Sequence, residues 1–217
     1  MLRIAAVAAL LALPLSASPA VAEQAPASVT LPIAAAVDSL PLAAESRAGY
    51  ERDLFNHWTD ADRNGCNTRA EVLIAESRVA PTIEPRCKVT AGEWYSYYDG
   101  VSVTAPGGLD IDHMVPLAEA WDSGASGWTA ARREAYANDL DADRSLVAVT
   151  ARTNRSKADQ DPAEWLPPLA DARCTYTADW VATKLRWSLS VDDRERAALV
   201  QLADGCGQQD VEYEPAP

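Results

Sequence analysis

Two stretches in the middle of the chain decide the fold: Leu109-Asp110-Ile111-Asp112-His113 and, further on, Leu146-Val147-Ala148-Val149. The first is a short apolar and charged segment that ends in charged groups, which predicts a strand. The second is an apolar run as long as a buried strand, and the residues from Asn154 onward predict a helix. Between the two stretches, residues 116–122 and 129–138 predict two more helices. The expected order is therefore strand, helical insertion, strand and helix.

The charged end of the first strand and the start of the last helix carry a set of side chains suited to phosphate chemistry. Asp112 offers a hard oxygen ligand for a divalent cation, and His113 beside it offers a general base. Asn154 adds a neutral oxygen ligand, so an ion such as Mg²⁺ would keep positions for water and a phosphate oxygen. The alternative is that a lone histidine is structural, which is our expectation for the other histidine, His57.

These motifs, in this order, resemble the HNH endonuclease superfamily, and most closely the secreted bacterial HNH proteins related to the C-terminal domain of GmrSD-type restriction enzymes. The stretch Asp161-Pro162-Ala163-Glu164-Trp165-Leu166-Pro167-Pro168 is similar as well, and the resemblance spans roughly Gly49 to Cys206. It implies an α+β fold with a ββα-metal finger embedded in a mainly helical, disulfide-stapled domain. It also implies metal-dependent cleavage of phosphodiester bonds in DNA, and possible action on RNA, with one Mg²⁺ or Mn²⁺ ion.

In that resemblance Asp112 and Asn154 correspond to metal ligands, and His113 corresponds to the general base. The chain departs from the pattern at Ser145, where many members have an asparagine that orients the histidine. A backbone carbonyl could replace that asparagine, because one hydrogen bond to a ring nitrogen fixes the tautomer.

Basic residues lie close to the proposed ligands. Arg155 and Lys157 are expected to contact phosphates of the substrate, and Arg152 could do the same; the alternative is a solvated basic helix face. Arg69, far earlier in the chain, is a further candidate for a phosphate clamp.

A second motif lies earlier in the chain. Asp60-x-Asp62-x-Asn64-Gly65, with Glu71 six residues after the glycine, matches the formula of an EF-hand calcium loop. Against calcium, position eight of the loop is Asn67, where a hydrophobic residue normally pairs with a second loop. The alternative expectation is an ion-free capped turn.

The N-terminus predicts export. Arg3, the apolar run of residues 4–15 and Ala20-Val21-Ala22 have the pattern of a signal peptide over residues 1–22, cleaved near Ala22. Residues 23–40, rich in Ala and Pro, predict a flexible leader, and residues 41–217 predict a single domain. No later stretch is long and apolar enough to span a membrane. We expect an extracellular monomer.

The four cysteines predict two disulfides in an exported chain, although four cysteines allow three pairings. Residues 175–187 and 190–203 predict two antiparallel helices joined by a tight turn, with Ser190 as the cap of the second. That geometry brings Cys174 beside Cys206 and leaves Cys66 with Cys87. Further elements are expected at residues 41–58 (helix), at 68–77 (helix capped by Thr68) and at 87–103 (strands).

Composition sets limits on the class of protein. The chain has 32 acidic and 19 basic residues among 217, a net charge of −13, and its 48% hydrophobic content excludes a disordered acidic tail. Such a charge counts against binding nucleic acid through the whole surface. Residues 152–157, however, contain three basic residues and no acid, so the local net charge there is positive.

Two other functions fit parts of the pattern. One is a carbohydrate-acting enzyme of the cell surface that uses Asp110, Asp112 and Glu119 as its acids. The other is a calcium-dependent binding module that keeps the HNH scaffold without its catalysis. The first leaves His113 and Asn154 without a role, and the second is motivated by Ser145 and the loop of residues 60–71.

Overall fold

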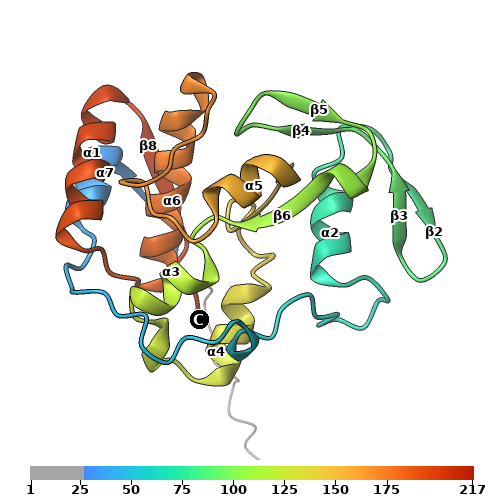
Figure 1. Ribbon diagram of the computed structural model, residues 1–217, viewed down its shortest axis with the longest axis horizontal. Helices are drawn as coiled ribbons and strands as arrows, with labels where there is room; N and C mark the ends of the chain where they lie inside the picture. Colours follow the sequence, from blue (N-terminus) through green and yellow to red (C-terminus); the bar gives the residue numbers. More distant parts are fainter. Residues whose placement is uncertain (1–26) are drawn as a thin grey trace, which may run out of the picture.

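The described part of the chain, residues 27–217 of a computed structural model, mixes helices with four small antiparallel sheets (Figure 1). The predicted signal peptide and its cleavage site lie outside the described residues. The helices are α1 (Ile33–Asp38), α2 (Thr68–Ala75), α3 (Leu117–Asp122), α4 (Ala130–Ala137), α5 (Ala151–Lys157), α6 (Arg173–Trp187) and α7 (Asp193–Gly205). The strands are β1 (Val29–Pro32), β2 (Thr82–Glu84), β3 (Lys88–Ala91), β4 (Trp94–Ser96), β5 (Val101–Val103), β6 (Leu109–His113), β7 (Leu146–Thr150) and β8 (Asp210–Tyr213). The predicted α+β class is confirmed.

The pair β6–β7, followed at once by α5, forms the centre of the molecule. The two strands are antiparallel, with Leu109 opposite Thr150 and His113 opposite Leu146. Because side chains alternate along a strand, Asp110 and Asp112 share one face of β6, and Leu109, Ile111 and His113 share the other. The order of strand, helical insertion, strand and helix is as predicted.

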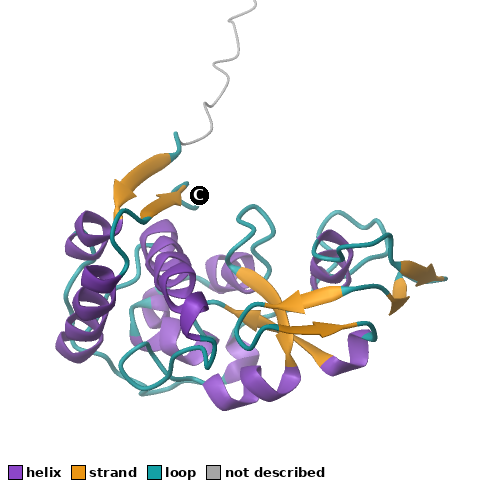
Figure 2. Ribbon diagram, turned by 90° about the horizontal axis from the view of Figure 1, so that it is seen from above, coloured by secondary structure: helices purple, strands orange, loops and turns teal. Residues whose placement is uncertain are grey.

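Each face of this hairpin is buried against its own hydrophobic cluster. Val147 and Val149 belong to the larger cluster, which also contains residues of α1, α3, α6 and α7. The opposite face packs on a smaller cluster that joins the hairpin to α2 and β4, with the members Val72, Leu73, Trp94, Leu109, Ile111, Leu146 and Ala148. In Figures 1 and 2 the hairpin and α5 lie between a helical part and a part that contains α2 and β2–β5. Both faces of the hairpin are therefore fixed by packing.

The N-terminal segment corrects one prediction. Residues 29–40 do not form a flexible leader: β1 pairs with β8, and α1 buries Ile33, Ala36 and Val37 in the larger cluster, where Leu40 is also buried. These positions follow the i, i+3, i+4, i+7 spacing of an amphipathic helix. The Ala-rich composition concealed that spacing, because alanine contributes little hydrophobicity to a pattern even where its methyl group packs fully.

The segment of residues 41–58 corrects a second prediction. The predicted helix is absent there; the segment contains an isolated bridge from Leu42 to Val191 and a short 3₁₀ turn, Arg52–Leu54. Leu42, assigned to the apolar stripe, is 56% exposed. Gly49 has a φ of 77° in this segment, a left-handed conformation that interrupts a helix and that glycine adopts without strain.

Helix starts differ from the prediction by a few residues. The cap of α2 is Asn67, whose side chain accepts the Ala70 amide, and the cap of α7 is Asp192, in place of Thr68 and Ser190. Helix α5 begins at Ala151, with Thr150 as its cap, so Asn154 lies inside the helix. In each case the observed cap is another residue of the type that accepts amide hydrogen bonds well.

Both predicted disulfides are confirmed. Cys66 is bonded to Cys87, and Cys174 at the start of α6 is bonded to Cys206 at the end of α7. Within residues 27–217, no helix has the length and apolar character needed to cross a bilayer.

Candidate active site

The face of β6 that carries Asp110 and Asp112 is turned toward α5. Asn154 Nδ2 of α5 lies 3.4 Å from Asp110 Oδ2, and Arg155 Nε lies 3.5 Å from the same oxygen. Asp110 keeps 31% of its side chain exposed and Arg155 keeps 77%. The asparagine predicted as a ligand is therefore in contact with Asp110, and this pair is open to solvent.

Asp112, one step deeper along the same face, is engaged in a buried ion pair. Lys157 Nζ donates to Asp112 Oδ2 at 2.6 Å, and the hydroxyl of Tyr98 donates to the same oxygen at 2.6 Å. Burial raises the pKa of Asp112, and the lysine opposes that rise. The Asp112 side chain is 6% exposed, so it reaches solvent far less than Asp110 does.

Lys157 does not lie where a phosphate contact was predicted. Its side chain is fully buried, and Nζ also donates to the carbonyl oxygens of His113 and Met114, both at 2.8 Å. Burial lowers the pKa of Lys157, and the Asp112 carboxylate opposes the change. All three ammonium hydrogens are used within the fold. This lysine therefore joins the C-terminal turn of α5 to the end of β6. Of the three basic residues at 152–157, Arg152 and Arg155 remain exposed.

His113 occupies the opposite face of β6. Its Nε2 lies 2.9 Å from the carbonyl oxygen of Ala137. Since a carbonyl only accepts, Nε2 carries the hydrogen and Nδ1 keeps its lone pair. The ring centroids of Trp58 and Tyr136 lie 5.6 Å and 6.4 Å away, and the side chain is buried. Burial lowers the pKa of His113 to about 3, so the ring is neutral near pH 7.

The Ala137 carbonyl makes the contact with the His113 ring that the resemblance would assign to an asparagine in place of Ser145. Ser145 itself donates to Asp139 Oδ2 at 2.7 Å. Sequence reasoning allowed for a backbone carbonyl, but nothing in the sequence singles out Ala137, because every residue has a carbonyl and only the path of the chain selects one.

The structure does not bring all the predicted residues together. Within residues 27–217 no hydrogen bond joins His113 to Asn154, and the strand places their side chains on different faces of β6. Arg69 lies near the start of β6, where Nη2 donates to the carbonyls of Pro106 and Leu109, both at 3.2 Å. It lines a pocket of about 320 Å³ beside Pro106.

The residues on the α5 side carry oxygen ligands for a divalent cation, but here Asn154 turns Nδ2 toward Asp110 and Asp112 is paired with Lys157, so an ion would require the Asn154 amide to turn. Two carboxylates at alternate positions of β6 and one amide from the facing helix form a set of oxygen donors of the kind that Mg²⁺ prefers. Asp110 was not predicted as a ligand in this arrangement, although its signal was present: it is two residues from Asp112, so both must share a face.

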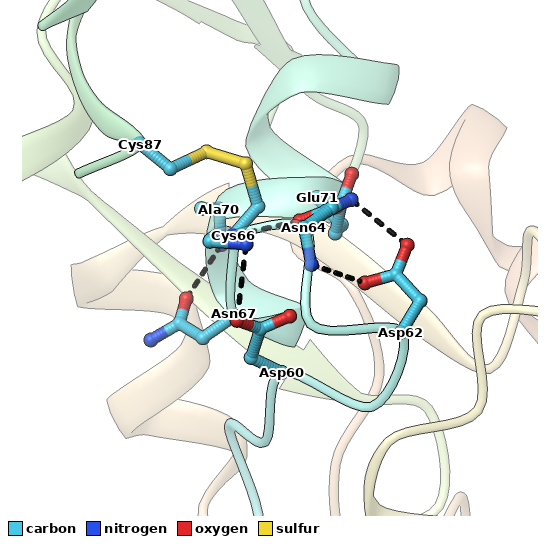
Figure 3. Close-up of a disulfide and its surroundings, with 9 residues drawn as sticks. Asp60, Asp62, Asn64, Cys66, Asn67, Ala70, Glu71 and Cys87 are labelled. Atoms are coloured by element: carbon cyan, nitrogen blue, oxygen red, sulfur yellow. Dashed lines mark hydrogen bonds between the residues drawn. A yellow bond between two sulfur atoms is a disulfide. The ribbon is translucent and has the colours of Figure 1, made fainter. Parts of the chain in front are cut away.

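The loop that matches the calcium formula is closed by its own hydrogen bonds (Figure 3). Asn64 Nδ2 donates to Asp62 Oδ2 at 2.9 Å and to Glu71 Oε1 at 2.7 Å. Asn64 Oδ1 accepts the Cys66 amide at 2.7 Å, and Asp60 accepts the Gly65 amide at 3.0 Å. A donor group thus stands between two carboxylates that calcium would need, an arrangement that favours the ion-free capped turn.

The acids of the carbohydrate alternative have different environments. Glu119 lies on α3 with a side chain only 4% exposed, and its Oε1 accepts from Lys184 Nζ at 2.9 Å and from Ser123 at 2.8 Å. Because Glu119 is enclosed and paired, it is not available as an acid beside Asp110.

The fold and the site together define the class: an α+β domain in which a β-hairpin and the helix after it face carboxylates toward an asparagine. The family model of the GmrSD restriction endonucleases, C-terminal domain, matches residues 53–202, and the chain belongs to this family. Membership indicates a nuclease-like HNH domain.

One relative is a protein of the fungus Arthroderma benhamiae described as an uncharacterized secreted protein. It is 42% identical over 158 residues, which cover 73% of this chain and 76% of the relative. The chain is thus similar to a fungal protein, whereas its motifs resemble those of secreted bacterial HNH proteins. No solved structure matches the chain.

Proposed function

We propose that the protein is an exported, metal-dependent HNH endonuclease that hydrolyses phosphodiester bonds in DNA, and in RNA as a further substrate. The observation that carries the proposal is the unit β6–β7–α5, which faces Asp110 toward Asn154 and Asp112 toward Lys157 in a chain of the GmrSD C-terminal family. The cofactor we propose is one Mg²⁺ ion, with Mn²⁺ as the substitute.

The proposed ligands are Asp112 and Asn154, as the resemblance implies, and Asp110, which the contact with Asn154 adds. When bound, the ion supplies a Lewis acid that polarises a phosphate oxygen of the substrate. Arg155, exposed beside these residues, contacts a phosphate once it leaves Asp110. Lys157 holds Asp112 and the end of β6 in place and does not touch the substrate.

His113 is the proposed general base, and Nδ1 is the atom that accepts the proton of the attacking water. The hydrogen bond from Nε2 to Ala137 supports this assignment, because it leaves the lone pair on Nδ1. A neutral ring is the form able to take a proton, although the burial that holds the pKa of His113 near 3 also makes it a weak base. Water must reach His113 past Trp58, whose ring lies against it.

Export is proposed on three observations. The N-terminal sequence has the pattern of a signal peptide, the related fungal protein is described as secreted, and the fold contains two disulfides. Disulfides form and persist in oxidising compartments. We propose that the exported form is a monomer.

The test is cleavage of supercoiled plasmid and of single-stranded RNA by the purified protein with Mg²⁺ or Mn²⁺, with and without a chelator. His113→Ala, Asp110→Asn and Asn154→Ala should each reduce cleavage at least about a hundredfold, the lower range for the loss of an acid–base group. His57→Ala, which changes the other histidine, and Lys88→Ala, which removes an exposed cation far from α5, are the matched controls.

Full activity of His113→Ala, or cleavage that a chelator does not affect, would exclude this mechanism. Calcium binding that Asp60→Asn abolishes, without cleavage of DNA or RNA by the wild-type protein, would favour the binding module. Ser145, which had motivated that alternative, no longer does so, because the Ala137 carbonyl contacts His113.

A further inference from the structure

A cluster of three carboxylates lies away from the candidate active site, where the segment after α1 crosses α3. Glu119 and Asp122 are three residues apart on α3 and so share a face of the helix. Glu45 approaches them from the segment between α1 and the turn Arg52–Leu54. One oxygen of each residue lies within 4.8 Å of the others.

Two oxygens of this cluster accept no hydrogen bond from any residue in the range 27–217. Glu119 Oε1 accepts from Lys184, and Asp122 Oδ2 accepts from Arg47 Nε at 2.6 Å. Asp122 Oδ1 and Glu45 Oε1, by contrast, are buried from solvent and accept no hydrogen bond from the described residues. The Asp122 side chain is only 8% exposed. Buried carboxylate oxygens without a donor are costly, so something must satisfy them.

The charges of the surroundings are also unbalanced. Lys184 is shared between Glu119 and Glu195, whose Oε2 lies 2.6 Å from Nζ, and Arg47 pairs with Asp122. Arg47 Nη1 also lies 3.5 Å from Asp159 Oδ2, so five carboxylates share two cations and leave an excess of negative charge that a divalent cation would reduce. Burial, and then the charge of Glu119, raises the pKa of Glu45 to about 8. A proton on Glu45 is therefore the competing way to relieve the excess.

We infer that Glu45, Glu119 and Asp122 form a binding site for a calcium-class divalent cation. Calcium binds carboxylate oxygens at about 2.4 Å, so two of its ligands are at most about 4.8 Å apart, and the three oxygens of this cluster all lie within 4.8 Å of one another. A cation here would provide the missing partner for Asp122 Oδ1 and Glu45 Oε1. It would also fasten the segment that carries Glu45 to α3.

This site is separate from the two other places where a cation has been considered. Asp110 and Asn154 lie on β6 and α5, and the calcium-formula loop precedes α2. The inference does not depend on nuclease activity. The three sites can therefore be distinguished by one conservative substitution in each: Glu45→Gln, Asp110→Asn and Asp60→Asn.

The experiment uses the purified protein after removal of metals with a chelator. Calcium binding is measured by calorimetry, and Tb³⁺ serves as a luminescent calcium analogue. Trp121 is the expected sensitiser, because it lies on α3 between the two ligands and donates to the Ala48 carbonyl of the crossing segment. We expect sensitised emission that calcium displaces, and a Kd at least about tenfold weaker in Glu45→Gln, since affinity follows the number of charged ligands.

Asp60→Asn and Asp110→Asn should retain the emission and the affinity. Asp122→Asn is a second test of the site, with Arg47→Met as its control, because that variant removes the ion pair and leaves the three carboxylates. The inference is overturned if the wild-type protein binds no calcium at millimolar concentration, or if Glu45→Gln binds it as the wild-type protein does. Either result would indicate that a proton on Glu45, and not a cation, relieves the excess of negative charge.

Discussion

Replacing Lys157 by methionine should destabilise the fold strongly. Methionine has nearly the length of lysine without the ammonium group, so the change removes the charge and little volume. The ammonium donates to Asp112 Oδ2, to the His113 carbonyl and to the Met114 carbonyl. After the change, the Asp112 carboxylate keeps only the hydroxyl of Tyr98 as a partner among these groups.

The magnitude follows from the burial of both partners, whose side chains are 0% and 6% exposed. Removing one partner of a buried ion pair costs about 3–5 kcal/mol, because the other charge is left uncompensated. For a domain of this size we expect the melting temperature to fall by roughly 10 °C or more. Adding Asp112→Asn to Lys157→Met should recover part of the loss, since the remaining buried group is then neutral.

The assay is urea unfolding of the wild-type protein, the two single variants and the double variant, with plasmid cleavage measured on the same samples. Arg155→Met is the matched control. Its side chain is exposed, so the free energy of unfolding should stay within about 0.5 kcal/mol of the wild-type value while the rate of cleavage falls. If Lys157→Met unfolds like the wild-type protein and only its cleavage is lost, the buried pair is refuted and Lys157 is a phosphate contact.

Four further outcomes are expected. An unfolded histidine binds a proton near pH 6.5 and His113 only near pH 3, so this residue removes stability as the pH falls through that range. Unfolding curves of wild type and His113→Asn should therefore diverge below pH 6.5, and parallel curves would contradict the low pKa. The double variant Cys174→Ser/Cys206→Ser should lose about 3–4 kcal/mol in the free energy of unfolding, measured in urea without reductant. Asn64→Asp removes the amide donor between two carboxylates of its loop, so its melting temperature should fall without calcium and recover with millimolar calcium. The logarithm of the DNA-binding constant, plotted against the logarithm of the salt concentration, should have a slope near −2 for the wild-type protein and near −1 for Arg155→Met.

The central unit of the fold was predictable because its signals are local. The apolar run Leu146-Val147-Ala148-Val149 and the charged strand before it required no knowledge of distant residues. The disulfide Cys174–Cys206 followed from two helices of similar length joined by a tight turn. The prediction of a helix over residues 41–58 was wrong because aromatic residues at helical spacing also occur where a chain packs irregularly. Phe55, for example, is fully buried without being in an α-helix.

The candidate site was predictable in its residue types and less so in its contacts. The sequence places Asp112, Asn154 and Lys157 near one another, but it does not say which of the two last residues meets Asp112. Helix α5 is short and held at both ends, so its rotation decides the partner: Asn154 faces Asp110, and Lys157 faces Asp112. That rotation depends on how α5 packs against β6 and β7, which the local sequence of the helix does not specify.

The buried cations also change what the net charge of −13 implies for substrate binding. Lys157 and Lys184 are fully buried and Arg186 nearly so, and all three are paired with carboxylates inside the fold. These residues contribute to the charge count and give no field to which a phosphate could respond. Near Asn154 the exposed positive charge reduces to Arg152 and Arg155, and Arg155 already faces Asp110. A site with so few free cations binds a polyanion only when another positive charge is present, and the carboxylates of β6 would repel it otherwise. On the proposed function, we therefore expect the protein to need a metal ion for binding the substrate as well as for cleaving it.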